Sequence, residues 1–140
     1  MNMSEVDQPL SSEAKILDDA YAALNRNDVA GFVKDFDPQI VRIEPADFPS
    51  TGTYHGIEAV TKHVYEGRST WAEGGCEPER FIVAGDKVVV AVHVRVRLND
   101  RTNWIDARIA DGFAFRDGKA VEFRTFLKES EALEWAGAKS

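Results

Sequence analysis

The most constraining feature of this chain is the regular alternation of side chains from Lys87 to Leu98. Every second residue is apolar, in the order Val88, Val90, Val92, Val94, Val96 and Leu98. Successive side chains of a β-strand point to opposite faces, so this segment predicts a long strand with one buried face. The other face carries His93, Arg95 and Arg97 and is partly polar. The valine face must therefore pack against other elements, which we expect to be helices.

Neighbouring segments predict more strands. They are Ile40 to Glu44, Arg80 to Ala84, Asn103 to Arg116 and Ala120 to Leu127. Asp117-Gly118 joins two of them and is a strong hairpin signal. The last strands therefore form an antiparallel meander. Pro45 stops the first strand, and the polar connection 45–56 is expected to form a cavity rim or lid.

Helical spacing of apolar residues predicts helices before and after the meander in the sequence. The first begins at Ser11 or Ser12, the second starts at Val29 and is closed by Pro38, the third runs from Ile57 past Trp71, and a last one covers Glu129 to Trp135. Helices that precede a curved antiparallel sheet define an α+β fold.

Length and composition indicate one ordinary globular domain. The chain has 140 residues, 44% hydrophobic and 29% charged, which suits a single domain at 11–140 behind a flexible tail at 1–10. No stretch approaches the roughly 18 apolar residues of a membrane span. Met1 to Leu10 lacks the features of a signal peptide, and Cys76 has no cysteine partner. We therefore expect a cytoplasmic protein that does not bind membranes.

Charge and motifs argue against several classes of function. The net charge of −7 opposes binding to nucleic acid. His55, His63 and His93 lie far apart in the sequence, and glycine-rich phosphate loops are absent. We expect neither a metal nor a cofactor.

Asp111 interrupts an apolar row on one face of the strand at 103–116. The row reads Ile105, Ala107, Ile109, Asp111, Phe113 and Phe115. A buried carboxyl group takes up a proton or finds donors, because an unpartnered buried charge is costly. Either Asp111 is such a buried acid, or it lies at a hydrated strand end beside Gly112.

The opposite face of the sheet predicts a cluster of charges. Arg95, Arg97, Asp106 and Arg108 can meet across the strands, with Trp104 nearby. This outer face is either solvated or the interface of a homodimer, since Trp and Arg are common interface anchors.

Several short motifs, in this order and spacing, resemble the nuclear transport factor 2-like (NTF2-like) superfamily and, within it, the SnoaL-like polyketide cyclases and ketosteroid isomerases. The motifs are Ala22-Ala23-Leu24-Asn25 with Asp28, Glu44-Pro45, Gly52-x-Tyr54-x-Gly56-x-x-x-Val60, and Asp111-x-Phe113-x-Phe115-x-Asp117-Gly118-Lys119. The resemblance covers most of the chain. It implies a cone-shaped fold in which a strongly curved, mainly antiparallel sheet and helices enclose a cavity.

The resemblance also implies site residues. In ketosteroid isomerases a carboxylate before a proline moves the proton, and a protonated aspartic acid and a tyrosine form the oxyanion hole. These positions fall on Glu44, Asp111 and Ala20, so Tyr21 is turned by about 100° from the tyrosine position. Strand parity places Val41 and Ile43 toward the core. It turns Glu44 away unless the strand twists or ends before Pro45.

Other residues are candidates for the cavity wall. His63 can serve as a general acid or base, and Tyr21, Tyr54, Trp71, Phe32 and Phe113 can contact the substrate. Each also has an ordinary explanation as a packed residue or a capping residue.

These observations favour an enzyme that moves a proton next to the carbonyl group of a small apolar molecule, as in isomerisation or polyketide cyclisation. The alternative is a non-catalytic domain that binds a hydrophobic ligand or mediates dimerisation. A water-activating hydrolase needs an acid–arginine–acid set in the cavity. Asp106 and Arg108 have the wrong parity for it when Asp111 points inward.

Overall fold

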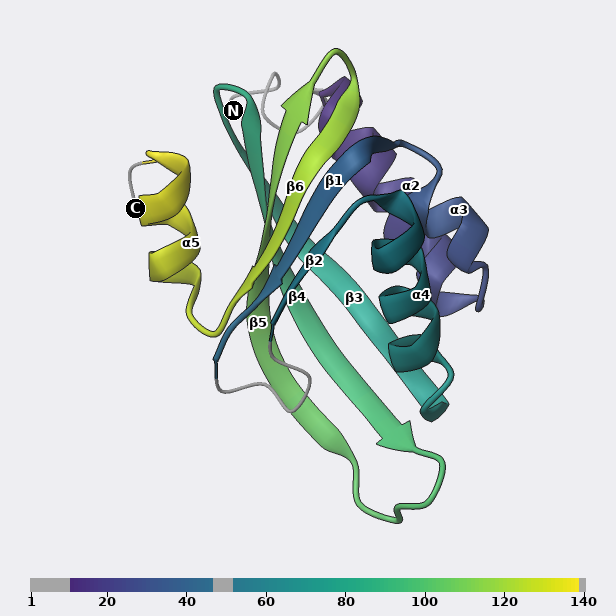
Figure 1. Ribbon diagram of the computed structural model, residues 1–140. Helices are drawn as coiled ribbons and strands as arrows, with labels where there is room; N and C mark the ends of the chain where they lie inside the picture. Colours follow the sequence, from purple (N-terminus) through teal and green to yellow (C-terminus); the bar gives the residue numbers. More distant parts are fainter. Residues whose placement is uncertain (1–10, 47–51, 139–140) are drawn as a thin grey trace.

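The computed structural model describes residues 11–46 and 52–138 (Figure 1). The predicted tail at 1–10 lies outside the described residues. The helices are α2 (Ser12–Asn25), α3 (Val29–Val33), α4 (Ile57–Arg68) and α5 (Glu129–Ala136). The strands are β1 (Phe36–Glu44), β2 (Gly52–His55), β3 (Trp71–Ala84), β4 (Lys87–Leu98), β5 (Ile105–Arg116) and β6 (Lys119–Phe126).

The strands form a six-stranded sheet in the order β2-β1-β6-β5-β4-β3. The β1–β6 pair is parallel, and the other neighbours are antiparallel. Helices α2, α3 and α4 lie on one side of the curved sheet, and α5 lies on the other (Figure 1). The expected α+β architecture with a curved, mainly antiparallel sheet is confirmed.

The main core lies between the sheet and the first helices. Tyr21 and Leu17 of α2 pack there with the inward face of β4, including Val88 and Val90. The alternation of β4 therefore meets the helices as the sequence predicts. Ser11 caps α2 by accepting a hydrogen bond from the Ala14 amide, which fixes the first predicted helix start.

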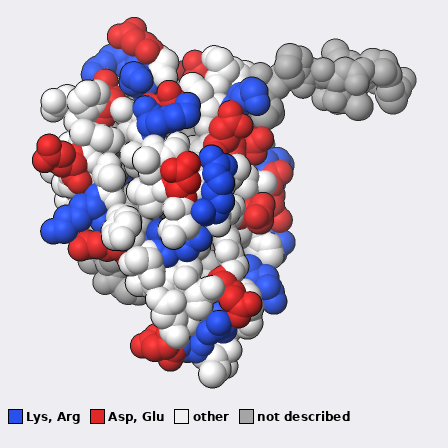
Figure 2. Space-filling model, turned by 90° about the vertical axis from the view of Figure 1, so that its right-hand side faces the viewer, with Lys and Arg blue, Asp and Glu red and all other residues white. Residues whose placement is uncertain are grey.

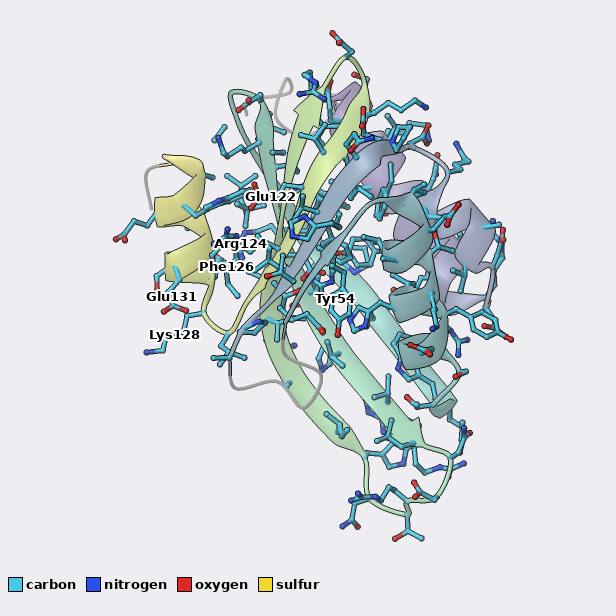
Figure 3. All side chains as sticks on the ribbon, viewed as in Figure 1. Tyr54, Glu122, Arg124, Phe126, Lys128 and Glu131 are labelled. Carbon is cyan, nitrogen blue, oxygen red and sulfur yellow. The ribbon has the colours of Figure 1, made fainter. Side chains whose placement is uncertain are left out.

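Helix α5 covers one end of the outer face. Leu133 packs there with Val89 and Ala110, and the Trp135 ring lies against the backbone of Gly112. Gly137 ends the helix in the left-handed conformation with φ 75°, which glycine adopts readily. In Figure 3, Glu122, Arg124 and Phe126 of β6 point toward the α5 side of the sheet.

Several predicted boundaries are wrong. The second helix ends at Val33, and β1 begins at Phe36, so Pro38 lies inside an irregular part of that strand. The third helix ends at Arg68, and Trp71 begins β3, where it pairs with Leu98. Strand β3 begins well before the predicted start at Arg80, because it pairs with the long strand β4 from Trp71 onward. Part of the connection 45–56 forms strand β2, and residues 47–51 lie outside the described residues.

Figure 2 views the molecule from the right-hand side of Figure 1, the side of α3 and α4. Acidic and basic side chains are interspersed there. None of the helices in the described ranges is long and apolar enough to cross a membrane.

Candidate functional site

A cavity of about 490 Å³ lies between the inner face of the sheet and helices α2 and α4. Most of its wall is apolar and includes Leu24, Phe32, Val64, Val94, Val96, Ile109 and Phe123. Its least exposed part holds polar residues, among them Tyr21 (2% exposed) and Asp111 (5%). Ile105 and Leu127 also line it and are 45% and 41% exposed, so they mark the rim. A ligand with an apolar body and a polar group that reaches this inner part matches the distribution.

Asp111 reaches the cavity from the inward face of β5. Its Oδ1 accepts a hydrogen bond of 2.6 Å from the Thr125 hydroxyl, and its Oδ2 accepts one from the Tyr21 hydroxyl. Burial raises the pKa of Asp111 above its ordinary value, while the nearby Arg42 charge and the two hydrogen bonds oppose the shift. Asp111 is thus a buried acid with built-in partners, and the hydrated strand end is ruled out.

Tyr21 lies closer to Asp111 than the sequence comparison implied. It comes from α2, lines the cavity, and donates its hydroxyl proton to Asp111. Burial, with the neighbouring Asp111 charge, raises the pKa of Tyr21 well above its ordinary value, so the phenol keeps its proton. Although Tyr21 follows Ala20, the expected tyrosine position, the position of α2 over the sheet brings the Tyr21 hydroxyl to Asp111 on β5.

Glu44 and Arg42 both point into the cavity from β1. The Arg42 Nη2 donates to Glu44 Oε2 at 3.3 Å, and its Nη1 donates to the carbonyl oxygen of Ile43 at 3.0 Å. The Arg42 guanidinium also lies 3.9 Å above the Phe123 ring. The parity argument that turned Glu44 outward is therefore wrong. These contacts supply the ionic and aromatic partners that a buried arginine needs.

His63 of α4 joins this group. Its Nε2 lies 2.7 Å from Glu44 Oε1, and its ring stacks on Tyr54 at 3.9 Å between centroids. Figure 3 shows Tyr54 on the side of the sheet that α4 covers. Tyr54 is not among the described residues of the cavity wall, so it supports His63 from behind. Glu44 and His63 form one hydrogen-bonded acid–base pair at the cavity.

The remaining predicted contacts divide into wall and core. Phe32 and Trp71 line the cavity. Phe113 is 0% exposed and stacks behind Phe123 at 4.6 Å, and it does not belong to the described wall. Cys76 also lines the cavity, and burial raises the pKa of its thiol to about 12, so the thiol is not activated.

Sequence reasoning missed Arg42 and Thr125. Arg42 shares a strand face with Glu44, so correct parity for one would have found the other. Thr125 is the cross-strand partner of Asp111, a pairing fixed by the register of β5 against β6. Within the described residues, no group of three or more His, Cys, Asp and Glu side chains is close enough to hold a metal ion.

Comparison with known proteins gives one family and many related folds. Residues 17–123 match the SnoaL-like domain family. An NTF2-like protein from Burkholderia thailandensis is 24% identical, with a TM-score of 0.74 over 93% of this chain and 100% of that one. TerC, crystallised with polyporic acid, is 20% identical, with a TM-score of 0.73 over 91% and 100%. A Catenulispora acidiphila protein with a ketosteroid isomerase-like fold, in complex with trimethylamine, is 14% identical, with a TM-score of 0.72 over 89% and 94%.

At these identities the structural matches establish the shared NTF2-like fold. A comparison with curated protein sequences found no significant match.

Proposed function

The chain belongs to the SnoaL-like domain family and has a small-molecule-binding cavity, and we propose that this cavity catalyses proton transfer next to a carbonyl group. The observation that carries the proposal is the placement of a buried acid with a tyrosine, and of a carboxylate–histidine pair, in the wall of one apolar cavity. Enolisation needs two such parts. One removes the proton from carbon, and the other stabilises the oxygen that becomes negative.

Tyr21 and Asp111 supply the donors. The raised pKa values of both groups favour their protonated forms, which can donate to an enolate oxygen. When the substrate binds, its oxygen accepts a hydrogen bond that otherwise joins the two side chains, and both groups keep their protons. Thr125 donates to Oδ1 of Asp111, so the hydrogen bond that the substrate replaces is the one between Tyr21 and Oδ2.

His63 supplies the base and Glu44 orients it. Glu44 engages Nε2 of His63, and Nδ1 has no hydrogen-bond partner among the described residues. A histidine held by a carboxylate at one ring nitrogen can accept a proton at the other. The imidazole removes the carbon-bound proton, Glu44 stabilises the resulting imidazolium, and the same proton returns to another carbon of the enolate.

The substrate is a largely apolar carbonyl compound. A volume of about 490 Å³ lies within the ordinary range for small-molecule sites. The structural neighbour TerC was crystallised with polyporic acid, which supports a small organic ligand in this fold.

The test combines a ketone with a mimic of its enolate. We expect the protein to accelerate exchange of the α-protons of 2-tetralone for deuterium, followed by proton NMR. We also expect it to bind 2-naphthol partly as naphtholate, followed by absorbance. Loss of an oxyanion donor costs about 10²–10³ in rate, and loss of a general base costs about 10²–10⁴. Tyr21→Phe should therefore reduce both exchange and ionisation, whereas His63→Gln should reduce exchange.

Tyr65→Phe is the matched control, because Tyr65 is 63% exposed and lies outside the described cavity wall. The proposal would be contradicted if the protein bound 2-naphthol only in its un-ionised form, with the same affinity in Tyr21→Phe, and did not accelerate the exchange of 2-tetralone. That result would favour the non-catalytic ligand-binding alternative.

One observation favours a second candidate, water addition. Arg42 donates to Glu44, and its charge opposes the rise in the pKa of Asp111, so these three residues make an acid–arginine–acid set in the cavity wall. It is built from residues other than Asp106 and Arg108. Turnover of an aryl epoxide in ¹⁸O-water would place the label in the diol if the cavity activates water.

A further inference from the structure

Arg68 is the last residue of α4 and lines the cavity close to solvent. It is half-buried, and its neighbours Gly67 and Thr70, which also line the cavity, are exposed. The acid–base groups already described lie in the less exposed part. Arg68 therefore faces a different portion of any ligand that fills the cavity.

The guanidinium of Arg68 is held in place by neutral groups. Its Nε donates to the carbonyl oxygen of Leu24 at 2.7 Å, and its Nη2 donates to that of Asn25 at 3.2 Å. Its central carbon lies 4.7 Å from the centre of the Trp71 ring. Because a guanidinium has five N–H groups, Nη1 and one N–H of Nη2 remain without a partner among the described residues.

Arg68 is also unusual among the arginines of this chain. Each of the nine other arginines has a carboxylate oxygen within 4.0 Å of its guanidinium. Arg42, for example, pairs with Glu44, and Arg108 pairs with Glu79. Within 11–46 and 52–138, no carboxylate comes this close to Arg68. In a chain with 24 acidic residues and a net charge of −7, the arginine without an acidic partner is one that faces the cavity.

We propose that Arg68 binds a carboxylate of the ligand, so that the natural substrate is an apolar keto acid. The assignment of the keto end rests on the proposed function. The keto end of the substrate enters first and meets Tyr21 and Asp111, and the carboxylate of the substrate stays near the rim on Arg68. The open Nη edge matches a carboxylate in shape, and the wall around it is largely apolar. A single fixed cation there favours a singly charged anion over a phosphate dianion.

The test measures the binding of three rigid hydroxy acids of increasing length and of their methyl esters. They are 4-hydroxybenzoic acid, 6-hydroxy-2-naphthoic acid and 4′-hydroxybiphenyl-4-carboxylic acid. A charged hydrogen bond to an arginine supports a preference of about tenfold for acid over ester. We expect this preference in at least one pair with the wild-type protein. It should vanish in Arg68→Gln and persist in part in Arg68→Lys.

Arg101→Gln is the matched control, since Arg101 is exposed and lies outside the described wall. Equal binding of acid and ester in every wild-type pair would overturn the proposal, as would a preference that survives Arg68→Gln. The wild-type comparison stands even if Arg68→Gln does not fold. Ionisation of 2-naphthol is read separately. If it fails while the acid preference holds, the proton-transfer function is wrong and the anion site remains.

Discussion

Replacing Thr125 with valine removes one of the two donors to Asp111 and changes little else. Thr125 is 3% exposed, and its hydroxyl lies 2.6 Å from Oδ1 of Asp111. Valine has the same branched shape, so the variant keeps the packing and the strand preference. A neutral hydrogen bond contributes about 1 kcal/mol, and one to an ionised group about 1.5–3 kcal/mol. The loss of stability must therefore depend on the charge of Asp111.

The sign of the pH dependence follows from the raised pKa of Asp111. A carboxyl group with a raised pKa in the folded state contributes stability that is fully present below the unfolded pKa. This contribution is lost as the pH rises through the folded pKa. Thr125→Val removes a donor to the carboxylate, which raises the folded pKa further. The destabilisation should be about 1 kcal/mol in acid, and should grow at higher pH by about 1.4 kcal/mol for each added pKa unit.

Urea unfolding of both proteins, followed by tryptophan fluorescence from about pH 4 to about pH 8, measures this difference. Thr53→Val is the control, because Thr53 lies on β2 and is exposed. A destabilisation that is the same at all pH values would refute the reasoning. It would mean that Thr125 does not influence the titration of Asp111.

Two further predictions concern the outer side of the sheet. A Cβ at Gly112 would lie 2.5 Å from Cζ3 of Trp135, so Gly112→Ala should destabilise the protein by about 1–3 kcal/mol in urea unfolding. Gly67→Ala in α4 is the comparison, because a Cβ at Gly67 has no other atom within 4 Å, and this substitution should stabilise the protein by about 0.5–1 kcal/mol. Equal effects of the two substitutions on stability would contradict the close packing of α5 on Gly112. We also propose that the outer face forms a homodimer, because Trp104 is 38% exposed and stacked under Arg95 at 4.1 Å. Light scattering should then give a dimer that Trp104→Ser weakens, and a monomeric wild-type protein would contradict this.

The sequence determined the parts of the fold that depend on local pattern. The alternation in β4 fixed its buried face, because the two-residue period of a strand needs no knowledge of its neighbours. The same rule placed Asp111 on the inward face of β5, where the structure has it. In β1 the rule predicted the wrong inward face, because both faces carry apolar residues, Val41 and Ile43 on one and Ile40 on the other. Apolar content alone did not show that the core face carries Arg42 and Glu44.

Tertiary structure decided which groups meet. Tyr21 reaches Asp111 across 90 positions of sequence, and His63 reaches Glu44 across 19. Those contacts depend on where α2 and α4 cross the sheet and on the register of the strands. Packing of the whole core sets both, and no local period records them. The sequence alone thus identified an inward-facing acid, and the fold gave it a tyrosine, a threonine and an arginine as neighbours.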